Sequence, residues 1–162
     1  MELYIHIPFC MKKCDYCDFL SAPYGLDVRR AYTAALCREI AFFGKKLAKE
    51  TVETIFIGGG TPSWLETELL DVIMRTVHQS FAVDADAEIS MECNPGTVSA
   101  AAFASYRRWG LNRLSIGLQS ANDDELAVRH AGISLATTFI RRAAIGDLRF
   151  DSRLKFGEDS TF

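Results

Sequence analysis

A chain of 162 residues, 49% hydrophobic and 24% charged, is long enough for one domain with a hydrophobic core and too apolar to be disordered. The formal net charge of -3 gives no electrostatic reason to expect nucleic acid or an anionic membrane as a partner. The N-terminus lacks the features of a secretory signal, and no stretch approaches the roughly 18 uninterrupted apolar residues of a membrane span, so we expect a cytoplasmic protein.

The first predicted strand, residues 3–7, leads into a loop that contains Cys10, Cys14 and Cys17. An odd number of cysteines in a reducing compartment argues against a disulfide framework and for metal or redox chemistry. The loop lacks the second cysteine pair of a structural zinc site, and three thiolates would leave one iron of a four-iron cluster open for chemistry. Buried or zinc-binding cysteines are the plainer alternative. None of the remaining candidates is an obvious fourth ligand, because each lies on a predicted helix or strand outside the loop. These candidates are Cys37, Cys93 and His6.

Beyond the cysteine loop, predicted strands and helices alternate along the chain. In order they are a helix from 27 to 49 capped by Asp27, a strand from 51 to 57, a helix that opens at Pro62, a strand from 87 to 93, a helix from 97 to 109, a strand from 113 to 119 and a helix capped by Asn122. Four such units require parallel strands with crossover helices, either in a doubly wound sheet or in part of a β/α barrel. The charge-dense end of the chain, 146–162, shows no convincing fifth strand.

Ligand-binding residue types recur where these strands end. A glycine turn, Gly58 to Thr61, follows the second strand, Glu92 lies near the end of the third, and Gln119 closes the fourth. Glycines let a ligand approach the backbone, whose free amides and carbonyls can pair with an amino acid moiety. The carboxylate can accept a bond from a ribose hydroxyl or an ammonium group. Parallel strands end at one edge of a sheet, so we expect these positions to meet the cysteine loop there.

The C-x3-C-x2-C motif after a strand resembles the cluster motif of the radical S-adenosylmethionine (SAM) enzymes. Four segments together are similar to the oxygen-independent coproporphyrinogen III oxidase group: 4–10, 56–63, 92–95 and 112–120. The resemblance covers the chain to about residue 126. It implies an α/β fold, a partial (β/α) barrel of the radical SAM type with about four β/α units, and a 4Fe-4S cluster and SAM as cofactors that carry the radical step.

This resemblance also implies roles for individual residues. Cys10, Cys14 and Cys17 would ligate the cluster, whose open iron would be chelated by SAM. No catalytic side chain is assigned. Haem or a porphyrin, and an electron donor such as flavodoxin or ferredoxin, are the further partners that it implies. The residues that would contact SAM are Tyr4, Gly59, Gly60, Thr61, Glu92 and Gln119.

Two positions depart from the oxidases of this group. Phe19 stands where they have a further cysteine, and in this substitution the chain is similar to the HemW-type haem-chaperone branch. Ala131 stands where the group has an arginine that reaches SAM. We therefore expect residues 1–128 to form the N-terminal part of a radical SAM core, and 129–162 to be the unrelated tail of a truncated or frameshifted chain with impaired activity. The alternatives are a haem or metal carrier without SAM turnover and a true coproporphyrinogen III dehydrogenase.

Overall fold

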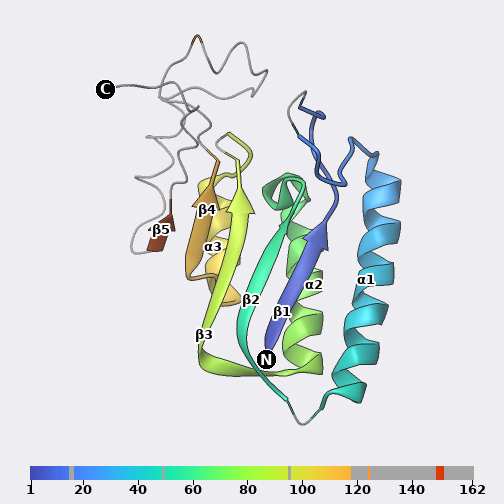
Figure 1. The fold of residues 1–162 in the computed structure, drawn as a ribbon, viewed down its shortest axis with the longest axis vertical. Coiled ribbons are helices and arrows are strands. Elements are labelled where there is room, and N and C mark those ends of the chain that lie inside the picture. The colour runs from blue at the N-terminus through green and yellow to red at the C-terminus, as the bar shows by residue number, and fades with distance from the viewer. Residues whose placement is uncertain (15–16, 49, 95, 118–123, 125–148, 152–162) are drawn as a thin grey trace.

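A computed structural model describes residues 1–14, 17–48, 50–94, 96–117, 124 and 149–151 (Figure 1). Its elements are β1 (Glu2–Ile7), α1 (Leu26–Lys46), β2 (Thr51–Gly59), the 3-10 helix η1 (Pro62–Trp64), α2 (Thr67–Ser80), β3 (Ala82–Cys93), α3 (Ala100–Arg108), β4 (Arg113–Ile116) and β5 (Arg149–Asp151). The strands form one sheet in the order β1-β2-β3-β4-β5, and every neighbouring pair is parallel.

The strand order distinguishes the two α/β arrangements that the sequence left open. A doubly wound sheet reverses its strand order at a switch point and carries helices on both faces. Here the strands follow chain order throughout. Figure 1 shows α2 and α3 behind the same face of the sheet, with α1 packed beside α2. This is the arrangement of an open (β/α) barrel, in which the face of the sheet opposite the helices lines the lumen.

Side chains alternate between the two faces of the sheet. The residues that face the helices are at most 3% exposed and form the core with the apolar sides of α2 and α3: Ile5, Ile7, Ile55, Ile57, Ile89 and Met91. On the opposite face Tyr4 is 57% exposed and Phe56 is 38% exposed. Their rings stack with centroids 5.9 Å apart. The open face is thus aromatic and accessible next to the end of β1.

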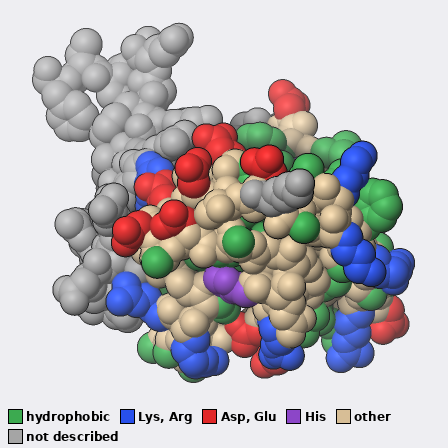
Figure 2. Space-filling model, turned by 90° about the horizontal axis from the view of Figure 1, so that it is seen from below, with side chains coloured by type: hydrophobic (Ala, Val, Ile, Leu, Met, Phe, Trp, Pro, Cys, Tyr) green, Lys and Arg blue, Asp and Glu red, His purple; other side chains and the backbone are tan. Residues whose placement is uncertain are grey.

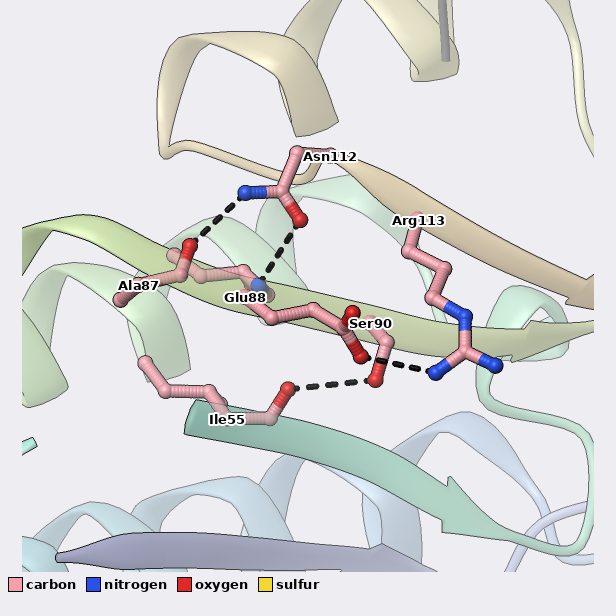
Figure 3. Close-up of polar contacts among 7 residues, drawn as sticks. Ile55, Ala87, Glu88, Ser90, Asn112 and Arg113 are labelled. Carbon is pink, nitrogen blue, oxygen red and sulfur yellow. Dashed lines mark hydrogen bonds and ion pairs between the residues drawn. The ribbon is translucent and has the colours of Figure 1, made fainter. Parts of the chain in front are cut away.

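The start of β4 is held against β3 by Asn112 (Figure 3). Its Nδ2 donates to the carbonyl of Ala87 at 2.7 Å, and its Oδ1 accepts from the amide of Ile89 at 3.0 Å. A slip of one residue would exchange the two faces of the strand, so these bonds help to set the register. In that register Glu92 lies opposite Ser115 on the open face.

We expect Asn112→Ala to lower the free energy of unfolding by about 1–3 kcal/mol, because it removes both side-chain bonds and leaves two backbone groups of β3 without these partners. Urea unfolding followed by circular dichroism measures the change. Gln79→Ala, at an exposed position near the end of α2, is the matched control and should shift stability by no more than about 0.5 kcal/mol. Equal stability of the two variants would contradict the proposed role of Asn112.

Two local predictions were wrong. The N-cap of α1 is Gly25, while Asp27 lies in the first turn, where its charge is favourable near the helix N-terminus. Pro62 opens the short η1 rather than α2, because the backbone at Leu65 returns to an extended conformation before α2 begins at Thr67. A helical apolar pattern that continues across such a break does not reveal the break.

The structure also contains a strand that the sequence did not predict. β5 pairs with β4, with Phe150 opposite Leu114. Three residues, two of them charged, are too few to show an alternating pattern, so this strand is recognisable only by its neighbour. Most of the predicted tail, the helix at Asn122 and Gln119 lie outside the described residues. No helix within the described ranges combines the length and apolarity that crossing a membrane requires.

Candidate functional site

The loop after β1, the glycine turn after β2 and the end of β3 lie at the same edge of the sheet (Figure 1). Strand register brings them to one level, since Ile7 is paired with Gly59. A hydrogen bond of 3.0 Å from the amide of Gly59 to Oε2 of Glu92 joins the second and third of these segments. The structure therefore brings the glycine turn into contact with Glu92 and with the start of the cysteine loop.

The cysteine loop is anchored at both of its ends. The amide of Cys10 donates to the carbonyl of Ala22 at 3.2 Å, and the amide of Ala22 donates to the carbonyl of Pro8 at 3.1 Å. Cys10 is buried, whereas Cys14 and Cys17 are half-buried. All five cysteines lie in the described part of the chain, and none forms a disulfide. Three thiols thus share one short loop beside the open face of the sheet.

The donor set of this loop fits an iron-sulfur cluster, which is held by cysteine thiolates. The absence of a side chain at Gly60 leaves space beside Cys10, because a Cβ there would lie 2.9 Å from its Sγ. Within the described ranges, no three His, Cys, Asp or Glu side chains are grouped closely enough to hold a metal ion. Ligation by Cys10, Cys14 and Cys17 would therefore require the loop to draw its sulfurs together.

The glycine turn differs from the prediction in one respect, because its amides are not free. The amide of Gly60 donates to the carbonyl of Ile7 at 2.8 Å, and that of Thr61 donates to the carbonyl of Phe9 at 2.7 Å. The amide of Gly59 is bound to Glu92. These amides hold the turn against the cysteine loop and the end of β3, so they are not available to the carboxylate of a ligand.

Tyr4 and His6 connect the open face to the cysteine loop, a link that the sequence did not reveal. Nε2 of His6 lies 3.3 Å from the carbonyl of Leu20, so this nitrogen carries the proton. In the neutral imidazole Nδ1 is then the acceptor, and the Tyr4 hydroxyl, 2.9 Å away, donates to it. Burial, and secondly the charge of Glu92, raise the pKa of Tyr4 above 10.0. The hydroxyl therefore remains protonated, and able to donate, at neutral pH.

A second polar network spans the ends of β2 and β3. Thr61 Oγ1 donates to Cys10 Sγ at 3.5 Å, and Asn94 Nδ2 lies 3.5 Å from Thr61 Oγ1. Asn94 is held in turn by its amide, which donates to Ser63 Oγ at 3.2 Å, and by its carbonyl, which accepts from Thr97 Oγ1 at 2.7 Å. Thr61 and Cys10 were predicted as site residues and Asn94 was not, although the Asn-Pro-Gly turn after β3 is a sequence signal that marks its position.

A cavity of about 670 Å³ lies at the other end of the sheet, away from the cysteine loop. It is lined by residues from α2, from the start of β3 and from the end of α3, among them Arg75, His78, Asp84 and Trp109. Figure 2 shows this end of the molecule, where acidic side chains gather on one side and basic side chains on the other. None of the predicted ligand residues lines this cavity.

The solved structure of coproporphyrinogen III oxidase (HemN) from Escherichia coli superposes with a TM-score of 0.85 at 28% identity, over 93% of this chain and 36% of that one. An AdoMet-bound structure of anSMEcpe matches with a TM-score of 0.59 at 14% identity, which shows the fold alone. The predicted α/β fold, a partial barrel of the radical SAM type, is confirmed by the first match and by the parallel sheet.

Curated relatives include haem chaperones named HemW. The protein of Escherichia coli (strain K12) is 44% identical over 127 residues, which are 78% of this chain and 34% of the relative. That of Synechocystis sp. (strain PCC 6803) is 38% identical over 159 residues, 91% of this chain and 38% of the relative. The chain thus spans little more than a third of their length. The sequence model described as the Radical SAM superfamily matches residues 4–146, and the chain therefore belongs to this superfamily.

Proposed function

We propose that this chain binds a 4Fe-4S cluster through Cys10, Cys14 and Cys17, that it binds SAM beside the cluster, and that it serves haem metabolism in the manner of the HemW-type chaperones. The observation that carries the proposal is the position of three thiols on one loop, directly beside the Gly59–Glu92 contact at the strand ends. A zinc site would need a fourth ligand, and both ring nitrogens of the nearby His6 already have hydrogen-bond partners.

A bound and reduced cluster would supply the electron that cleaves SAM. The residues of this chain would position the cofactor. Glu92 presents a carboxylate held in place by the amide of Gly59, so it is pre-oriented to accept a bond from an ammonium group or a ribose hydroxyl. Tyr4 offers its hydroxyl on the open face of the sheet. We propose that the backbone carbonyls of the turn at Gly59 and Gly60 also accept hydrogen bonds from SAM. Gln119, at the end of the predicted fourth strand, is a further proposed contact with SAM.

The haem-related part of the proposal is supported by the names of the relatives and by Phe19, the residue that differs from the oxidases. Phe19 is 62% exposed and the adjacent Leu20 is 85% exposed, so an apolar surface adjoins the cysteine loop. Such a surface suits a planar apolar ligand. Haem or a porphyrin is the ligand that we propose, with flavodoxin or ferredoxin as the electron donor.

Anaerobic reconstitution with iron and sulfide tests the proposal. We expect about four iron and four sulfide per chain and the brown colour of a cysteine-ligated cluster. A colourless product that binds one zinc ion tightly would contradict it. Addition of SAM and a reductant to the loaded protein then separates the alternatives, since cleavage of SAM indicates radical chemistry and binding without cleavage indicates a carrier. Decarboxylation of a porphyrinogen would identify a true oxidase, and saturable haem binding without it supports the chaperone.

A further inference from the structure

We propose that Thr61 is a positioning residue for Cys10, and that its hydroxyl raises the reduction potential of a cluster bound there. This inference rests on the proposed function, because it concerns a ligand of the proposed cluster. It also assigns Thr61 a role other than SAM contact. Its basis is the series of hydrogen bonds that leads from the end of β3, through the turn after β2, to the sulfur on the loop after β1.

The Thr61 hydroxyl and the Cys10 sulfur are held together by the surrounding backbone. Oγ1 lies 3.5 Å from Sγ, a normal separation for a bond to the large sulfur atom, and the side chains belong to residues that are 7% and 9% exposed. The amide of Thr61 is bound to the carbonyl of Phe9, the residue before Cys10. The lack of a side chain at Gly60 permits this approach, since a Cβ there would lie 2.7 Å from the same carbonyl.

Asn94 sets the direction of the hydroxyl. A threonine hydroxyl has one proton to donate, and its oxygen can accept from another donor at the same time. Asn94 Nδ2 approaches that oxygen at 3.5 Å, which leaves the proton of Thr61 to point toward Cys10. The backbone of Asn94 is bound on both sides, by Ser63 and by Thr97, so this donor keeps its place.

A donor aimed at a ligand sulfur favours the reduced state of a cluster. Reduction adds negative charge that is shared with the ligating sulfurs, and a hydrogen bond to a charged acceptor is stronger than one to a neutral acceptor. Hydrogen bonds to the sulfurs are among the features that set cluster potentials. Burial strengthens the effect, because the bond is shielded from water. Removal of the Thr61 hydroxyl should therefore make the cluster harder to reduce.

The test compares three chains after reconstitution, without SAM: the unaltered protein, Thr61→Val and Thr61→Ser. Valine keeps the branched shape and removes the hydroxyl, whereas serine keeps the hydroxyl. The midpoint potential of each cluster is measured by a redox titration followed by electron paramagnetic resonance. We expect Thr61→Val to lower the equilibrium constant of one-electron reduction about threefold to tenfold, where tenfold corresponds to about 59 mV. Thr61→Ser should stay close to the unaltered protein.

Asn94→Ala provides a second variant that leaves Thr61 in place, and it should shift the potential in the same direction by a smaller amount. If Thr61→Val does not load iron, the potential of the Asn94→Ala cluster tests the inference in its place. Equal potentials of the unaltered and altered proteins without SAM would overturn the inference, as would a difference that arises only after SAM is added, since that would make Thr61 a SAM contact. Failure of the proposed function is distinguishable, because the unaltered protein itself would then take up no cluster.

Discussion

Replacement of Cys14 by serine is expected to abolish cluster assembly. Serine offers a hydroxyl in place of the thiolate that would ligate iron in the proposed site, which would be left with two cysteines. Iron content after reconstitution should fall from about four iron atoms per chain to well below one. Cys10→Ser and Cys17→Ser are expected to behave in the same way, and iron and sulfide analysis measures the loss. This is the largest functional effect that we expect from a single substitution.

Cys37→Ser is the matched control for this prediction. Cys37 is half-buried on α1, outside the loop, and it packs against the edge of the core. Its replacement removes a thiol of the same kind and should leave iron content unchanged. Equal losses in Cys37→Ser and Cys14→Ser would show that iron uptake reports the stability of the fold rather than ligation by the loop. Retention of a full cluster by Cys14→Ser would contradict the assigned ligand set.

Gly59→Ala is expected to destabilise the fold by about 2–4 kcal/mol, the sum of backbone strain and a steric clash. The backbone at Gly59 has φ +118°, a conformation that residues with a side chain rarely adopt. A Cβ there would also lie 2.7 Å from the ring of His6. Urea unfolding of the variant measures the loss. Because the same turn carries the Glu92 contact, SAM affinity of the loaded protein should fall as well.

Gly25→Ala is the control for that substitution. Gly25 has φ -66°, and a Cβ there would meet no atom within 4 Å. We expect a change within about 0.5 kcal/mol, since neither strain nor a clash arises. The double variant His6→Ala/Gly59→Ala separates the causes in part, because it removes the clash with the His6 ring and keeps both the strained φ and the 3.0 Å approach to the Ile7 carbonyl. If Gly59→Ala were as stable as Gly25→Ala, the turn would not require glycine.

Local patterns predicted most of the fold. Alternating and helical spacing identified β1, α1, β2, β3, α3 and β4, with ends that differ by a few residues from those observed. The apolar/polar alternation of β3 extends back to Val83, but alanine and aspartate are depleted in strands, and the sequence indicated the strand only from residue 87. The three-residue β5 has no pattern of its own. Sequence periodicity therefore predicts an element that is long enough for its apolar spacing to repeat. It does not predict a short strand that forms only because a neighbouring strand pairs with it.

The sequence by itself determined the spacing of the three cysteines, the glycines after β2, the acidic residue near the end of β3, and the parallel sheet that brings them to one edge. These depend on order along the chain and on the periodicity of the backbone. Only the tertiary structure decided that the sheet is singly wound, that the turn amides are bound to the β1 loop and to Glu92, and that Thr61 points at Cys10. The reason is that a side chain 51 residues away in sequence becomes a partner only when strands pair in a particular register.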